Sequence, residues 1–212
     1  MSTVHQLKIT LKHIKPAIWR EVLVPSDIRL DRLHQVIQIA MGWEDRHMHE
    51  FSAGKRGFSE LRFGSRAVAS EFGPGFGDAP PVRDEKKATL LDLAPVKGSK
   101  FVYWYDFGDD WLHDVVVKAV DEPVAGLQVP GCMRAVGACP PDDCGGPPGY
   151  LHLLEVLADP KHEEYDEICE WVGDDWKPDQ YDIVQVNADL AQLAARWARR
   201  PAPRKSAIKP KT

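Results

Sequence analysis

Two histidines lie two positions apart in the acidic segment EDRHMHEF, which spans residues 44–51. We predict a short strand over residues 47–51, in which His47 and His49 project from the same face with their Cα atoms about 6 to 7 Å apart. That separation allows two imidazoles to bind one divalent cation, with zinc as the first candidate. The alternative is that one histidine packs and forms a hydrogen bond in the core while the other is exposed to solvent.

Two further side chains could complete the coordination of this cation. His113 follows the acidic turn at Asp109 and Asp110 and leaves the rim of a predicted hairpin. Cys139 lies in a loop rich in glycine and proline, PGCMRAVGACPPDDCGGPPG, which a bound cation would hold in place. The aspartates also suit a tight turn, and His113 beside Trp111 is equally consistent with a stacked core residue. The predicted metal ligands are His47, His49, His113 and Cys139, and the predicted cofactor is zinc or another divalent metal.

The four cysteines of the chain, at positions 132, 139, 144 and 169, form only a weak zinc motif. Three of them follow the spacing C-x6-C-x4-C, which lacks the C-x2-C pair of most structural zinc sites. Because the cytosol keeps thiols reduced, we expect free thiols rather than a disulfide framework.

The segments that carry these side chains predict one shared polar pocket at an end of the sheet. EDRHMHEF, the hairpin rim FGDDWLH and the loop around Cys139 would meet there, with aromatic rings as walls. We expect His47 or His49 to lie within about one water's reach of His113 or Asp109. The residues of the predicted ligand pocket are Trp43, Asp45, Asp106, Asp109, Trp111 and Tyr150.

The apolar pattern predicts the elements that would position this pocket. Alternating apolar residues predict strands at residues 5–14, 18–24, 47–51, 100–107 and 111–120. Helical spacing predicts helices at residues 30–42, 150–158, 163–172 and 183–198, with a short helical turn at 89–93. Dense glycine and proline with little periodicity indicate irregular chain at residues 54–87 and 130–149.

This order of elements predicts an α+β fold with a mainly antiparallel or mixed sheet covered by helices. The first elements are similar in order to a β-grasp arrangement. We expect a single domain over residues 1–198, in which 54–87 is a long loop or insertion and 150–198 is a helical part. Residues 199–212 contain six basic residues, no acid and three prolines, which predicts a disordered basic tail.

The charge balance limits the partners of the protein. The chain has 27 Lys and Arg against 32 Asp and Glu, and without the tail 21 basic residues face the same 32 acids. Only the tail could neutralise phosphates, so we expect at most weak, non-specific binding of nucleic acid. No stretch approaches the roughly 20 apolar residues of a bilayer span. No secretory signal is evident, and we therefore expect no membrane association and a cytoplasmic location.

Signatures of nucleophilic and nucleotide-dependent catalysis are absent from the sequence. It contains no G-x-S-x-G elbow, no Walker A loop and no Rossmann glycine pattern in the right context. Cys139 is the candidate nucleophile, but Pro140 and Pro141 follow it and provide no amide for an oxyanion hole. The sequence therefore weighs against an enzyme of these classes.

Three segments carry a resemblance to a known family. They are LKITLKHIKPAIWREVLVPSDIRLDRLHQVIQIAMGWEDRHMHEF, YDFGDDWLHDV and ACPPDDCGGPPGYLHLLEVLADPKHEEYDEICEW. Across most of residues 5–190 the chain resembles the plasmid pRiA4b ORF-three-like family. The resemblance implies no particular reaction, because this family is defined by sequence. Its members resemble proteins encoded on plasmids and insertion elements. Some carry the label resolvase, but this chain lacks the serine-centred pattern and the long basic C-terminal domain that a resolvase needs.

Three functional hypotheses follow from these observations. The leading one is a cytosolic module, organised by a divalent metal, that binds an unknown protein or small-molecule partner and belongs to mobile or plasmid-borne gene sets. The second is a metal-dependent hydrolase, and the third is a nucleic-acid accessory protein that acts through the tail. The residues of the hydrolase site would be His47, His49, Asp109 and His113.

Overall fold

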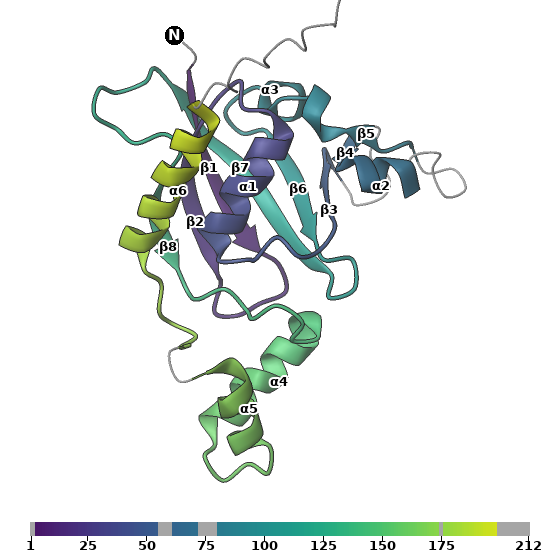
Figure 1. The fold of residues 1–212 in the computed structure, drawn as a ribbon, viewed down its shortest axis with the longest axis vertical. Helices are drawn as coiled ribbons and strands as arrows, with labels where there is room; N and C mark the ends of the chain where they lie inside the picture. Colours follow the sequence, from purple (N-terminus) through teal and green to yellow (C-terminus); the bar gives the residue numbers. More distant parts are fainter. Residues whose placement is uncertain (1–2, 55–60, 72–79, 174–175, 199–212) are drawn as a thin grey trace, which may run out of the picture.

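In the computed structural model, which describes residues 3–54, 61–71, 80–173 and 176–198, the strands form one sheet in the order β5-β4-β3-β6-β7-β1-β2-β8 (Figure 1). All neighbouring strands pair antiparallel except β4 and β5, which are parallel. The predicted α+β class with a mixed sheet is therefore confirmed. The strands are β1 (Val4–Leu11), β2 (Trp19–Pro25), β3 (His49–Ser52), β4 (Arg62–Gly64), β5 (Arg83–Asp84), β6 (Lys100–Tyr105), β7 (Trp111–Asp121) and β8 (Gly131–Val136).

Helices cover one face of this sheet. Figure 1 shows α1 and α6 crossing the same face, while α4 and α5 pack on each other beyond one end of the sheet. The apolar stripe of α1 is fully buried at Leu33, Val36 and Ile37, and each such side chain stabilises the fold by about 1.5 to 3 kcal/mol. The helices are α1 (Leu30–Met41), α2 (Arg66–Glu71), α3 (Leu90–Leu93), α4 (Gly146–Ala158), α5 (Tyr165–Val172) and α6 (Ile183–Ala198), with a 3-10 turn, η1 (Glu85–Lys87).

The central strands follow the alternation that the sequence predicts. In β6 the buried positions are Phe101, Tyr103 and Tyr105, and in β7 they include Trp111 and His113. Because successive side chains of a strand point to opposite faces, these rings all project under the helices. They form the aromatic part of the core. The ends of β6 and β7 define where the following loops begin.

The edge strand β8 is protected by a side chain of α6. Asn187 Oδ1 accepts a hydrogen bond from the amide of Cys132 at 2.8 Å, and Asn187 Nδ2 donates to the carbonyl of the same residue at 2.9 Å. The amide side chain thus occupies the position of a neighbouring strand, which blocks edge-to-edge association at this point. It also fixes α6 against the sheet.

Several element boundaries differ from the sequence predictions. The strand expected at residues 47–51 begins at His49, so His47 lies before it. The described residues of 54–87 form β4, α2, β5 and η1, which are too short to show a period. The irregular region 130–149 contains β8, and α4 begins at Gly146 because proline is tolerated in the first turn of a helix.

Two further expectations concern the C-terminal tail and membrane-spanning helices. The predicted tail, residues 199–212, lies outside the described residues. None of the helices in the described part of the chain is long and apolar enough to cross a bilayer.

Arg20 of β2 is fully buried and connects its strand to α1, to β8 and to the segment before α6. Its Nε donates to the carbonyl of Ala40 at 2.7 Å and its Nη2 to that of Met41 at 3.3 Å, both in the last turn of α1. Its Nη1 donates to the carbonyl of Val136 at the end of β8, at 2.9 Å. The guanidinium also lies 4.0 Å from the centroid of the Tyr181 ring, just before α6. One cation therefore ties together α1, β8 and the chain that enters α6.

Replacing Arg20 with methionine should destabilise the protein strongly. The variant leaves buried carbonyls short of a donor, and each such group costs about 1 to 3 kcal/mol. We expect a loss of roughly 3 kcal/mol in the free energy of unfolding, measured by urea denaturation. Arg29→Met is the matched control, because Arg29 pairs with Asp31 at an exposed position and should lose less than about 1 kcal/mol. Equal losses in the two variants would contradict a clamping role for Arg20.

Candidate functional site

Three loops meet beyond one end of the central strands. They are residues 42–48 after α1, residues 106–110 between β6 and β7, and residues 137–145 between β8 and α4. We call this region the three-loop junction. The amide of Glu44 donates to Asp142 Oδ2 at 3.4 Å, which joins the first and third loops. The structure thus brings together the three sequence segments that were expected to meet.

The hairpin loop also holds the start of α4. The amide of Gly145 donates to Asp109 Oδ2 at 3.1 Å. A Cβ atom on Gly146, whose φ is +67°, would lie 2.2 Å from the carbonyl oxygen of Asp109. Only glycine allows the two backbones to approach this closely. Asp109, a predicted pocket residue, therefore serves as an anchor for α4.

Backbone strain concentrates in this junction. Five non-glycine residues of the described chain have a positive φ, and four of them are aspartates of these loops: Asp45, Asp106, Asp110 and Asp143. The left-handed region costs an L-residue roughly 1 to 2 kcal/mol, although aspartate tolerates it better than most. Strain of this kind persists where surrounding contacts hold a functional geometry.

His47 lies between two aspartates from the other two loops. Its Nε2 is 3.6 Å from Asp106 Oδ2 and 3.4 Å from Asp143 Oδ1. One ligand atom from each of the three side chains lies within 4.8 Å of the others. His47 Nε2 is inaccessible to solvent and makes no hydrogen bond. Around a tetrahedral cation with bonds of 2.0 to 2.2 Å, ligand atoms are about 3.4 Å apart, so the distances from His47 Nε2 to the two aspartates fit a shared cation.

Neighbouring groups orient these ligands. Asp106 Oδ1 accepts hydrogen bonds from the amides of Gly108 at 2.9 Å and Asp109 at 3.3 Å, which leaves Oδ2 directed at His47. The hydroxyl of Tyr105 accepts a hydrogen bond from the amide of Arg46 at 3.2 Å, and its ring packs edge-on against the His47 imidazole. Outer partners of this kind fix the orientation of metal ligands.

The structure does not bring the predicted ligands His47, His49, His113 and Cys139 around one point. His49 lies elsewhere in the sheet, where its Nε2 is 2.7 Å from Glu85 Oε2 and its ring stacks on His34 at 3.5 Å. In the described part of the chain, His47, Asp106 and Asp143 form the one group of three such side chains with this spacing. The cause is the strand boundary, because β3 begins after His47 and the two histidines do not share a strand face.

His113 is buried beneath the junction, and Cys139 is partly buried. His113 is fully buried, its Nδ1 lies 3.2 Å from the carbonyl oxygen of Tyr103, and burial lowers its pKa to about 4. Burial raises the pKa of the Cys139 thiol well above its usual range, so this thiol stays protonated and is a poor nucleophile. His113 therefore matches the alternative of a packed core residue, and Cys139 is a free thiol that packs against the core.

The aromatic residues of the predicted pocket form the floor of the junction. The Trp43 ring lies 5.5 Å from that of Trp111 and 5.2 Å from that of Tyr105, between centroids. The Trp111 ring in turn meets Tyr150 of α4 at 6.5 Å. These contacts join the first loop to β6, β7 and α4 through apolar surface, and such rings carry large burial energies.

Sequence reasoning missed a closed circuit of hydrogen bonds that holds Asp45. Gln38 Nε2 donates to the Tyr103 hydroxyl, which pairs with His34 Nδ1, each at 2.8 Å. His34 Nε2 is 2.7 Å from Asp45 Oδ1, and the backbone amide of Asp45 donates a hydrogen bond to Gln38 Oε1 at 2.9 Å, which closes the circuit. Burial lowers the pKa of His34, which favours the neutral ring. The signal was present, because His34 and Gln38 lie on the helix face that also carries Leu30, Leu33 and Ile37.

Comparison with known proteins supplies the family. The family model described as "Plasmid pRiA4b ORF-3-like protein" matches residues 3–185. The chain belongs to the plasmid pRiA4b ORF-3-like family. It is also 40% identical to "Uncharacterized protein y4hQ" of Sinorhizobium fredii over 202 residues, which cover 94% of this chain and 97% of that protein.

A solved structure supports the fold and the relationship. The crystal structure of a protein of unknown function, MM3350 from Methanosarcina mazei Go1, superimposes with a TM-score of 0.72 at 35% sequence identity. The match covers 87% of this chain and 98% of that one. The family and the α+β fold are thus shown, and neither relative carries a functional description.

His113 should make stability depend on pH in the acid range. Its folded pKa of about 4 lies below its usual value of 6.5, so the unfolded chain binds the proton first and stability falls as the pH falls from about 6.5 to 4. Protonation of this group alone should lower the free energy of unfolding by about 3 kcal/mol over that range. We expect His113→Asn to show a shallower fall in urea denaturation, whereas His152→Asn, an exposed control, keeps the original slope. An unchanged slope in His113→Asn would show that this imidazole titrates normally.

Proposed function

We propose that the protein is a binding module that holds a divalent cation at His47, Asp106 and Asp143 and uses the cation to bind a partner. The observation that carries this proposal is the His47 imidazole, whose inaccessible Nε2 has no hydrogen bond and lies at ligand spacing from two carboxylates. A buried polar atom without a partner calls for an explanation, and a bound ion is one of the few available.

The surroundings leave room for an exchangeable ligand on the cation. The side chain of Asp143 is 67% exposed and that of His47 is 25% exposed, so one side of the cluster faces solvent. Three protein ligands leave a fourth tetrahedral position for water or for an oxygen or nitrogen atom of a partner. One imidazole and two carboxylates suit zinc or manganese better than copper(I), which prefers sulfur ligands.

Cation binding should be tested directly with Zn²⁺ and Mn²⁺ as probes. We expect one equivalent to bind protein purified without a metal-binding tag, measured by titration calorimetry and elemental analysis. Asp143→Asn and Asp106→Asn should each weaken binding at least tenfold, because a neutral amide is a poor ligand. Asp106→Asn keeps an Oδ1 atom for the turn, so it tests the ligand role rather than folding.

The cation titration has one control variant, and two of its results would refute the proposal. Asp121→Asn, at the exposed end of β7, should bind the cation as the unmodified chain does. Absence of binding at millimolar cation, or equal binding by Asp143→Asn, would refute the proposal. Metal-dependent turnover of a generic ester or phosphodiester would favour the hydrolase instead, and DNA binding that is lost on deletion of residues 199–212 would favour the nucleic-acid function.

A further inference from the structure

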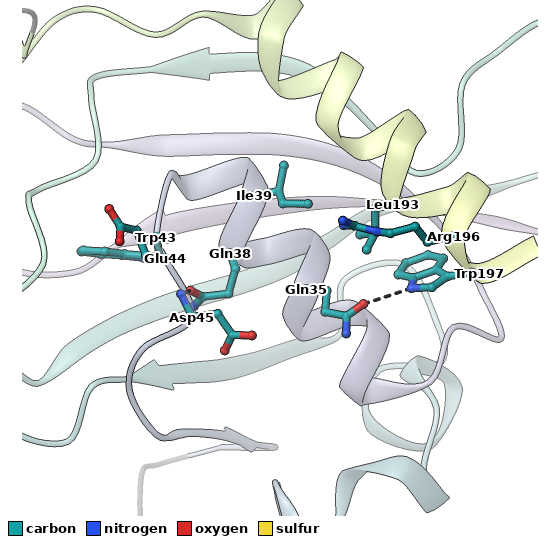
Figure 2. Close-up of a pocket in the computed structure, with 9 residues that line it drawn as sticks. All are labelled: Gln35, Gln38, Ile39, Trp43, Glu44, Asp45, Leu193, Arg196 and Trp197. Atoms are coloured by element: carbon teal, nitrogen blue, oxygen red, sulfur yellow. Dashed lines mark hydrogen bonds between the residues drawn. The ribbon is translucent and has the colours of Figure 1, made fainter.

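A groove separate from the cation cluster runs between α1 and α6. Its volume is about 470 Å³, which lies within the usual range of small-molecule sites. Figure 2 shows the residues that line it: Gln35, Gln38, Ile39, Trp43, Glu44, Asp45, Leu193, Arg196 and Trp197. The groove therefore combines side chains from the first loop of the junction with side chains from the last turns of α6.

The two ends of the groove carry opposite charge. Glu44 and Asp45 lie together at one end, and Arg196 lies at the other end beside Trp197 (Figure 2). Both acids are accessible, with side chains 59% and 57% exposed. Glu44 forms an ion pair with Arg46, so the net negative charge of this end comes from Asp45, whose Oδ1 lies 2.7 Å from His34 Nε2. The arrangement favours a ligand with one cationic and one anionic end, and it disfavours polyanions such as nucleotides and polycations such as polyamines.

The walls of the groove are fixed before any ligand binds. Trp197 Nε1 donates to Gln35 Oε1 at 3.0 Å, which ties α6 to α1, and Arg32 lies over the same indole ring at 5.0 Å. The amide of Gln38 is engaged on both sides by the circuit that also holds Asp45. Trp197 and Gln38 therefore need little ordering on binding, which lowers its entropic cost.

The length of the groove indicates the size of the ligand. The distance along α1 from Gln35, beside Trp197, to Gly42, just before the acids, is roughly 10 Å at 1.5 Å per residue. An extended peptide covers about 3.3 to 3.6 Å per residue. Three residues thus match the length of this segment of α1, along which Ile39 and Leu193 provide apolar contact.

We infer that this groove binds short peptides of about three residues whose two termini are free. The α-ammonium group would face Asp45 beside the Glu44–Arg46 pair, the α-carboxylate would pair with Arg196, and the side chains would pack against Ile39 and Trp197. The inference does not depend on the proposed cation, because none of its contacts involves His47, Asp106 or Asp143.

The test is titration calorimetry of the full chain with trialanine in buffer that contains EDTA, so that its outcome is independent of the cation site. We expect trialanine to bind, and N-acetyl-trialanine and trialanine amide each to bind at least tenfold more weakly, because each lacks one charge-assisted contact. Spermidine, a cation without a carboxylate, should bind more weakly than trialanine. No binding of trialanine at millimolar concentration, equal binding of the blocked peptides, or preference for spermidine would overturn the inference.

Substitutions at exposed residues test whether the peptide binds in the groove. Arg196→Gln should weaken trialanine at least tenfold and abolish the difference between trialanine and its amide. Glu44→Gln should reduce the difference between trialanine and its N-acetyl form. Arg66→Gln on α2 is the matched control and should leave both differences intact. Equal discrimination in Arg196→Gln and Arg66→Gln would show that the peptide binds elsewhere.

Discussion

The guanidinium of Arg20 is fully buried, and each hydrogen bond described for it ends on a backbone carbonyl. A buried cation without a carboxylate is costly unless dipoles replace its water shell. The last carbonyls of α1 do so, because the C-terminus of a helix carries partial negative charge. The Tyr181 ring adds a cation–π contact. This single residue therefore fixes where α1 ends and where β8 ends, and two loops of the junction start at those points.

Besides the hydrogen bonds of Arg20, contacts of several kinds hold the three-loop junction together. Aromatic rings form its floor, the circuit through His34 holds Asp45, and Asp109 secures the start of α4. Aspartates with positive φ persist because these contacts outweigh the local strain. The cation cluster lies on the solvent side of the floor, and the groove lies beside it along α1. Both candidate sites thus depend on loops that begin at rigid elements.

Much of the fold could be predicted from alternation alone. The hairpin of β6 and β7 is regular, and its buried face follows a strict period of two. The same period places Arg20 on the face of β2 shared with Val22 and Val24, so its burial could have been inferred. The edge strand β8 could not, because its glycine-rich flanks suggest a loop and its protection comes from Asn187, 55 positions away. Strands β4 and β5 are too short for any periodicity to show.

The candidate site was predictable in its location and less so in its ligands. The sequence predicted that EDRHMHEF, FGDDWLH and the loop around Cys139 meet, and contacts of Glu44 with Asp142 and of Gly145 with Asp109 link parts of these segments. The ligand set depended on one strand boundary, and the start of β3 at His49 separates that imidazole from His47. Asp143 lies in a loop without any period, so its approach to His47 could not be predicted from periodicity.

The most direct test of this account is the Zn²⁺ affinity of Arg20→Lys. Lysine retains the charge but cannot reach the carbonyls of α1 and β8 together, so both loops should shift while the sheet remains folded. The account predicts at least a tenfold loss of Zn²⁺ affinity in titration calorimetry, at a temperature where circular dichroism shows the variant to be folded. Unchanged affinity in the folded variant would show that the junction is positioned without this clamp.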